Sequence, residues 1–233
     1  MATPDHTPRG RGYDESLSYL DGANDYWTSA TSGWCGSKLY TDLWASSSPA
    51  FGQNNSLACS QKAQAGCRYE DELFTNFTIA AIRAHASGNA SQPLFLYFAP
   101  HNVHVPLEVP AEQLAKFSFI EPGVEVAPRR NYAAMVNLVD QHIGQVVDAL
   151  VAGGLWDNSI LLLTADNGGP CYGPYSGCTT CDGSAGGNNY PLRGGKVSNF
   201  EGGVRANALV SGGLIPPSLR GTSLAGLTAI EDW

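Results

Sequence analysis

A carboxylate, an amide and two glycines follow directly on an apolar run in the second half of the chain. Asp166 and Asn167 come after the run 159–164, and Gly168 and Gly169 come next. Carboxylate and amide oxygens are the hard ligands that Ca²⁺ and Mg²⁺ prefer, and glycines let the backbone turn sharply beside an ion. The pattern therefore predicts a metal site on Asp166 and Asn167. An ordinary turn after a strand, for which Asp-Asn-Gly is also typical, is the alternative.

Two apolar runs predict the strands that carry such a site. The run 159–164 is short, almost wholly apolar and followed by turn residues, which is typical of a buried parallel strand. Leu94–Ala99 has the same character and predicts a second strand buried on both faces. Because sites in open α/β sheets form at the carboxyl ends of strands, we expect the loops after both strands to share one edge.

Two helices are expected to cover this sheet. One begins near Asp71 to Leu73, where acidic residues suit the amino end of a helix, and ends at Gly88. The other ends at Gly153 and carries an apolar stripe. The stripe consists of Tyr132, Val136, Val139, Ile143, Val146 and Leu150. Strand, helix and strand in this order indicate a right-handed crossover and an α/β fold with a mostly parallel sheet, whereas residues 1–66 suggest loops and short strands.

Two further side chains have chemistry suited to an anionic substrate. His104 follows the 94–99 strand through a short loop, and an imidazole can bind an anion or donate a proton near neutral pH. Lys196 follows Gly194 and Gly195, which allow the backbone to approach an anion closely. Taken alone, a packing role for the histidine and a solvated loop position for the lysine are the alternatives.

Taken in order along the chain, these segments resemble the sulfatase family, and its arylsulfatase B-like members in particular. The resemblance rests on Pro93–Leu107, Asp166–Gly169, Pro191–Lys196 and Phe200–Arg205. It extends from about residue 9 to the end of the chain and is weakest over 170–189. It implies the alkaline phosphatase-like α/β fold, a sandwich in which helices flank a mostly parallel central sheet.

The resemblance also implies a reaction and a role for each matched residue. The reaction is hydrolysis of an organic sulfate ester with a bound Ca²⁺, Mg²⁺ being less favoured. The formylglycine hydrate attacks sulfur, and the metal polarises the sulfate. Asp166 and Asn167 would be metal ligands, Lys196 would bind the sulfate, and His104 would contact the sulfate and protonate the leaving oxygen. Arg193, Glu201 and Arg205 are expected to brace the loop as a salt-bridge network, and His101 and Asp140 to be structural.

The family's nucleophile is expected to lie outside this sequence. Formylglycine is formed from the cysteine of a Cys-x-Pro-x-Arg segment, and none of the six cysteines has that context. Family members are about twice as long as these 233 residues. We therefore interpret residues 1–233 as a partial sulfatase catalytic domain, truncated at both ends, which is inactive alone and supplies part of the metal and sulfate site.

The overall charge limits the possible partners. The formal net charge is −8, from 13 Lys and Arg against 21 Asp and Glu, so nucleic acid is not expected as a partner. No apolar run is long enough to span a bilayer. The expected partner is a sulfated small molecule or glycan, held by local cations and a metal.

Cysteines and glycosylation sequons favour the secretory pathway, with an extracellular or lysosome-like location, although the sequence has no signal peptide. Six cysteines and sequons at Asn54, Asn76 and Asn89 are typical of an oxidising compartment. Cys35 is expected to pair with Cys59 or Cys67, and the cysteines at 171, 178 and 181 among themselves. A zinc or redox role for the pair 178 and 181 is the alternative.

Two other functions remain open at this stage. One is a catalytically inactive sulfatase-like protein that binds sulfated glycans. The other is a phosphodiesterase or phosphonate hydrolase of the same superfamily, which uses a similar sheet and metal site. The His-x-x-His-x-Pro and Gly-Gly-Lys patterns at 101–106 and 194–196 favour sulfate over phosphate esters.

Overall fold

The structure is a computed structural model that describes residues 3–31, 39–46, 48–49, 67–88, 91–120, 126–170 and 186–232. Its helices are α1 (Glu70–Gly88), α2 (Ala111–Ala115), α3 (Val126–Ala152) and α4 (Glu201–Val204). Its strands are β1 (Leu17–Ser18), β2 (Ala30–Thr31), β3 (Tyr40–Thr41), β4 (Trp44–Ala45), β5 (Ser48–Pro49), β6 (Leu161–Thr164) and β7 (Ala208–Ser211). Short 3₁₀ turns are η1 (Pro4–His6), η2 (Arg9–Arg11), η3 (Trp156–Asn158), η4 (Pro217–Leu219) and η5 (Ile230–Asp232).

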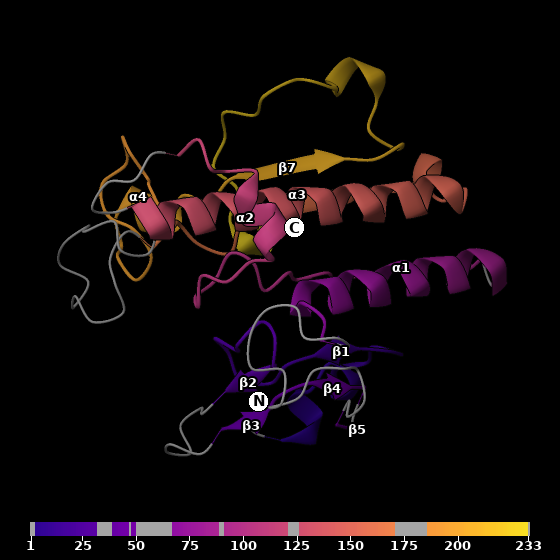
Figure 1. The fold of residues 1–233 in the computed structure, drawn as a ribbon. Coiled ribbons are helices and arrows are strands. Elements are labelled where there is room, and N and C mark those ends of the chain that lie inside the picture. The colour runs from indigo at the N-terminus through magenta and orange to yellow at the C-terminus, as the bar shows by residue number, and fades with distance from the viewer. Residues whose placement is uncertain are drawn as a thin grey trace.

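Helices α1 and α3 lie side by side and form the central layer of the molecule (Figure 1). Ile82 of α1 packs on Val146 and Ala149 of α3, and Leu96 and Phe98 cover this contact. Burying these aliphatic and aromatic groups stabilises the pair of helices by removing apolar surface from water. Both predicted helices are thus confirmed, with α1 ending at Gly88 as expected.

The buried face of α3 differs from the predicted stripe. Val136 is 46% exposed, whereas Met135 and His142 are fully or almost fully buried. The buried positions of the helix are Ala134, Met135, Leu138, His142, Val146 and Ala149. The predicted stripe shares Val146 with this face, but it left out two large apolar residues, Met135 and Leu138, as well as the alanines and the histidine that also face the core.

The amino-terminal lobe consists of short antiparallel strands, as expected for its composition. β1 pairs with β4, β4 with β5, and β2 with β3. Figure 1 shows this lobe beside the amino-terminal half of α1. Tyr26 and Trp27 are buried with Tyr69 in one core cluster.

The parallel sheet is not confirmed within the described residues, and the two predicted strands are less buried than expected. β6 does form after η3, but it pairs antiparallel with β7, with Leu162 opposite Val210, and its side chains alternate between half-buried and exposed. Leu94–Ala99 is extended without a strand partner among the described residues, and Phe95 and Tyr97 are 77% and 74% exposed. In both segments one face packs inward and the other is left open, because no second layer covers it within the described residues.

Cys67 is disulfide-bonded, which confirms that this cysteine is oxidised. Cys35, Cys59 and the three cysteines of 171–181 lie outside the described residues, as do Asn54 and Asn89. Asn76 lies on the exposed face of α1. Across the described ranges, no helix combines the length and the apolar character that a membrane span requires.

Candidate functional site

The turn 166–169 after β6 is held by backbone contacts with the segment around α4. The amide of Gly168 donates to the carbonyl of Gly203 over 2.9 Å, and the amide of Gly202 donates to the carbonyl of Arg193 over 2.9 Å. A Cβ placed on Gly168 would overlap the carbonyl oxygen of Gly202, and one on Gly202 would overlap that of Gly194. Glycine is therefore required here for close backbone approach.

Asn189 joins the same turn to the loop that carries Lys196. Its amide nitrogen donates to the carbonyls of Gly169 (2.7 Å) and Gly194 (3.1 Å), and its oxygen accepts from the amide of Gly169 over 3.1 Å. The backbone amide of Lys196 also donates to Gly169, over 3.2 Å. Sequence reasoning missed Asn189, and its only signal was a polar amide just before the Arg-Gly-Gly-Lys pattern.

His104 has a defined ring orientation in the loop after the extended segment. Its Nδ1 lies 2.8 Å from the carbonyl oxygen of Val105. A carbonyl only accepts hydrogen bonds, so Nδ1 carries the proton of the neutral ring and Nε2 carries the lone pair. The imidazole is half-buried, and desolvation lowers the pKa of His104 from its usual 6.5.

The charges around His104 show that the predicted site residues converge. Besides desolvation, the positive charges of Lys196 and His101 lower the pKa of His104, whereas the hydrogen bond to Val105 and the negative charge of Asp166 raise it. The structure therefore brings Lys196 and Asp166, from two other segments, within electrostatic reach of His104. Their individual roles stay predictions.

Tyr19 borders the same region and was not predicted as part of it. Burial, followed by the negative charges of nearby carboxylates that include Asp166, raises the pKa of Tyr19 to about 12. Its ring centroid lies 5.2 Å from that of His101. The tyrosine thus connects the amino-terminal lobe to the loop of His104 and to the turn of Asp166.

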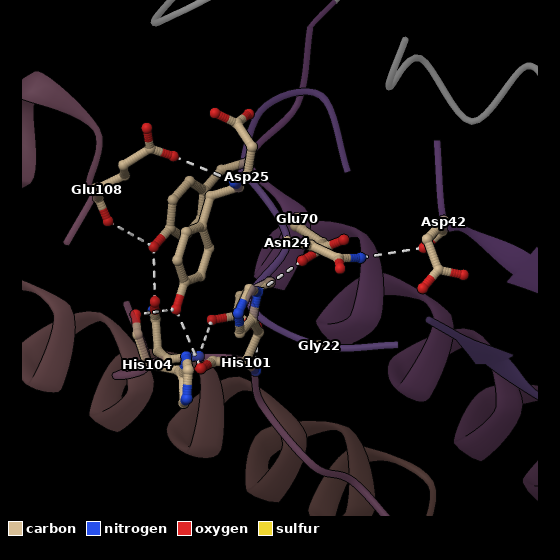
Figure 2. A network of polar contacts seen from close by, with 12 residues as sticks. Gly22, Asn24, Asp25, Asp42, Glu70, His101, His104 and Glu108 are labelled. Carbon is tan, nitrogen blue, oxygen red and sulfur yellow. Dashed lines mark hydrogen bonds and ion pairs between the residues drawn. The ribbon is translucent and has the colours of Figure 1, made fainter. Parts of the chain in front are cut away.

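A buried polar network packs against the His104 loop (Figure 2). The hydroxyl of Tyr26 lies 3.0 Å from the carbonyl of His101 and 2.9 Å from that of His104. Tyr69 lies within hydrogen-bonding distance of Asn102 Oδ1 (2.6 Å) and the carbonyl of Glu108 (2.9 Å). Burial raises the pKa of both tyrosines, which keeps their hydroxyls protonated as donors.

Asp71 binds this loop rather than its own helix end. Its carboxylate accepts from the amides of His101 (2.7 Å) and Asn102 (2.9 Å) and is fully buried. Burial raises the pKa of Asp71 from 3.8 to about 6, against the lowering effect of the two amides. The acidic start of α1 was predicted to suit the helix terminus, and that prediction missed its contact with the loop.

Asp166 and Asn167 fit a hard cation in donor type. The Asp166 side chain is exposed and accepts no hydrogen bond within the described residues, whereas the Asn167 side-chain amide donates to Gly168 over 3.0 Å. Two oxygens supply part of the six to eight that Ca²⁺ takes. The described residues contain no cluster of three or more His, Cys, Asp or Glu arranged for a metal.

The expected salt-bridge network is partly present. Glu201 pairs with Arg205 over 3.4 Å on the exposed face of α4. Arg193 instead lies over the ring of Phe200, 3.9 Å from its centroid, a cation–π contact. Asp140 is exposed on α3. His101 is buried and paired with Glu70, which agrees with its predicted structural role.

Similarity to known proteins identifies the family of this chain. The Sulfatase family model matches residues 2–224. The chain belongs to the sulfatase family. It is 32% identical over 232 residues to arylsulfatase J of Mus musculus, covering 98% of this chain and 33% of that protein. It is also 32% identical over 118 residues to arylsulfatase A of Homo sapiens, covering 51% of this chain and 20% of that protein.

Solved structures of related proteins show the same fold. The crystal structure of Ps i-CgsB in complex with k-i-k-neocarrahexaose is similar with a TM-score of 0.68 and 27% identity. That match covers 89% of this chain and 41% of the other. The alkaline phosphatase-like fold of the family is therefore shared, and this sulfatase chain spans about a third of the length of the arylsulfatase J that it matches.

Replacement of Gly168 by alanine is expected to destabilise the protein. The new methyl group overlaps the Gly202 carbonyl, so the two segments must separate, and we expect a loss of about 2–4 kcal/mol in the free energy of unfolding. Gly144→Ala is the control, because this glycine lies within α3 with open space around it and should gain up to about 1 kcal/mol. Urea denaturation measures both, and equal stabilities for the two variants would contradict the close approach.

Asp71 is expected to make stability fall as pH rises from about 4 to 6. Its pKa is 3.8 ordinarily and about 6 in the fold, so the native state retains a proton that the unfolded state releases in this window. This contribution is fully present below pH 3.8 and is lost as pH passes 6. Urea denaturation midpoints measured across this pH window should lose this pH dependence in Asp71→Asn. The control Asp140→Asn, at an exposed position of α3, should retain it.

Proposed function

We propose that the protein containing this chain is a sulfatase that hydrolyses an organic sulfate ester, and that this chain supplies part of its metal and sulfate site. The observation that carries the proposal is the convergence of His104, Lys196 and Asp166 from three separate segments of a sulfatase-family chain. A histidine, a lysine and a carboxylate at one place provide a proton donor, an anion-binding cation and a metal ligand.

Lys196 would act on the sulfate, and His104 would act on the leaving oxygen. Lys196 would neutralise sulfate charge as a compact ammonium, and its loop is anchored to Gly169 through the backbone. His104 would donate from Nε2, because Nδ1 is engaged with Val105. A protonated Nε2 can transfer its proton to the oxygen that departs from sulfur, which lowers the charge on the leaving group.

Asp166 and Asn167 would hold a Ca²⁺, with Mg²⁺ less suited because it demands a stricter octahedral set of ligands. Such an ion would supply electrostatic stabilisation of the negative charge on the sulfate. The oxygens of this chain fit such an ion in chemical type. The nucleophile expected from the family, formylglycine, has no matching cysteine in this sequence, so the chain is proposed to be inactive alone.

The proposed substrate is a sulfated small molecule or glycan. One structural neighbour was solved with an oligosaccharide, k-i-k-neocarrahexaose, which supports a carbohydrate substrate. An inactive glycan-binding relative remains the second candidate, because the nucleophile is not in this sequence. A phosphodiesterase function has less support, since the matched curated relatives include arylsulfatases.

The same reasoning extends to location and to the larger fold. The disulfide at Cys67 supports an oxidising compartment, such as the secretory pathway or a lysosome-like organelle.

Residues 1–233 are proposed to form part of a catalytic domain in which a mostly parallel sheet joins the extended segment 94–99 and β6. The exposed faces of Phe95 and Leu162 are consistent with a larger sheet in the complete domain.

Lys196→Met is expected to weaken binding of sulfate esters. Removing the ammonium takes one charge-assisted contact from the anion, and we expect roughly tenfold weaker binding. Binding of 4-nitrophenyl sulfate to the 233-residue chain would be followed through the imidazole NMR signals of His104, and sulfate release would be assayed in the same samples. Lys116→Met, in an exposed lysine bonded to Gln113, is the matched control.

The same titration tests the pH dependence and the enzyme proposal. Affinity for the anion should fall as pH rises through the pKa of His104, which lies below 6.5, since the protonated ring attracts the sulfate. No turnover is expected from this chain. Equal binding by both lysine variants would refute the sulfate site, and turnover by the chain would refute the assignment of the nucleophile to another segment.

Asp166→Ala is expected to abolish Ca²⁺-dependent activity in a protein that contains the whole catalytic domain. The substitution removes the charged oxygen ligand, and the remaining site should bind Ca²⁺ at least tenfold more weakly. Calorimetric Ca²⁺ titration and arylsulfatase assays would measure both effects. Asp157→Ala, just before β6 in η3, is the control. Unchanged Ca²⁺ affinity in Asp166→Ala would exclude this residue as a ligand.

A further inference from the structure

Glu70 and His101 form a fully buried pair beneath the loop that carries His104. The Glu70 carboxylate is 0% exposed and His101 is 3% exposed, and Oε2 of the one lies 2.8 Å from Nδ1 of the other. A carboxylate oxygen accepts hydrogen bonds, so the contact is made with the ring proton of His101 on Nδ1. Figure 2 shows Glu70 reaching from the start of α1 to this ring. Neither residue has a part in the proposed sulfate chemistry.

The pair depends on this single hydrogen bond. Within the described residues, His101 Nε2 and Glu70 Oε1 are buried without a hydrogen-bond partner. Buried polar groups are costly when they are unpaired, so the one contact that is made has a large effect on how the ring is held. Loss of the Glu70 carboxylate would leave the His101 ring with no polar contact to fix its rotation.

The ring of His101, held by Glu70, stacks on the ring of Tyr26. The two rings are stacked, with centroids 4.1 Å apart and planes 13° apart. On its other face Tyr26 stacks on Tyr69 at 5.0 Å. The position of the Tyr26 ring, and hence of its hydroxyl, is therefore determined by the rings on either side.

The Tyr26 hydroxyl in turn contacts the backbone of His104. It lies 2.9 Å from the His104 carbonyl and 3.0 Å from the His101 carbonyl, and the amide of His104 donates to that same His101 carbonyl over 3.0 Å. These contacts close a tight turn from His101 to His104. The ring centroids of the two histidines lie 6.1 Å apart.

We propose that Glu70 and His101 are positioning residues that act through Tyr26 to hold His104 with Nδ1 on the Val105 carbonyl and Nε2 available to a substrate. This inference rests on the role proposed above for His104. The charged and titratable groups that face the pair are Asp71 from α1, Tyr69 just before α1, Tyr19 and Tyr26 from the amino-terminal lobe, and His104 from the same loop. In this arrangement the start of α1 determines the geometry of a side chain more than thirty residues later in the sequence.

The test measures the tautomer of His104 directly. Long-range ¹H–¹⁵N spectra of the 233-residue chain resolve its five histidines, and His104→Gln assigns the relevant signals. The neutral His104 ring of the unaltered chain should be in the Nδ1–H form. Glu70→Ala should lower the ratio of Nδ1–H to Nε2–H tautomer by about tenfold, the equivalent of one lost hydrogen bond. Glu70→Gln should restore the ratio, because its amide oxygen still accepts from Nδ1 of His101.

Two further variants separate positioning from loss of fold. Glu72→Ala, on the same turn of α1, is the matched control and should leave the His104 signals unchanged. Tyr26→Phe removes only the hydroxyl and should also mix the tautomers of His104. This variant decides the question if circular dichroism shows that Glu70→Ala does not fold. A folded Glu70→Ala or Tyr26→Phe with the His104 tautomer of the unaltered chain would overturn the proposal.

Failure of the positioning proposal can be distinguished from failure of the proposed sulfate site. The tautomer of His104 is measured without any sulfate ester present. If Glu70→Ala and Tyr26→Phe mix the tautomers but the chain binds no 4-nitrophenyl sulfate, the positioning proposal holds and the sulfate site is refuted. If the chain binds the ester and the tautomer is unaffected by either variant, the sulfate site holds and the positioning proposal is overturned.

Discussion

The burial of two carboxylates at the start of α1 is the constraint on which the site depends. Glu70 and Asp71 are both 0% exposed, and a buried carboxylate costs several kcal/mol unless hydrogen bonds compensate for lost water. The compensating donors are the backbone amides of residues 101 and 102 and the ring of His101. The loop therefore has to lie against the end of α1, and the helix layer of α1 and α3 fixes the place of His104.

The second half of the site is held by a different kind of contact. The turn 166–169 and the segment 193–203 approach so closely that glycine is required on both sides, and backbone amides and carbonyls join them directly. Asn189 adds side-chain hydrogen bonds to both segments. Lys196 and Asp166 thus occupy one rigid unit, whereas His104 belongs to the unit anchored on α1. The site lies where these two units meet.

The sequence predicted which side chains lie near one another better than it predicted the sheet. His104, Lys196 and Asp166 lie in short motifs whose residue types carry chemistry, and the structure does bring them together. The strands were misjudged because an apolar run indicates only that a segment is extended. It does not indicate the direction of the neighbouring strand or whether other elements cover both faces. Phe95 is exposed although its run is apolar throughout. Asn189 and Glu70 were missed because their contacts join distant segments and leave no local pattern.

Although the pKa of His104 is lowered in the structure, this residue can still act as a proton donor when an anion is bound beside it. In the structure as it stands, desolvation and the charge of Lys196 oppose protonation of the ring. A sulfate group placed beside Lys196 and His104 would reverse the balance, since a negative charge beside an imidazole favours its protonated form. Anion binding and proton uptake by His104 are therefore coupled, and each must strengthen the other. In the sulfatase proposed above, a histidine that is neutral without an anion and charged beside one would have its proton in place when the ester oxygen departs.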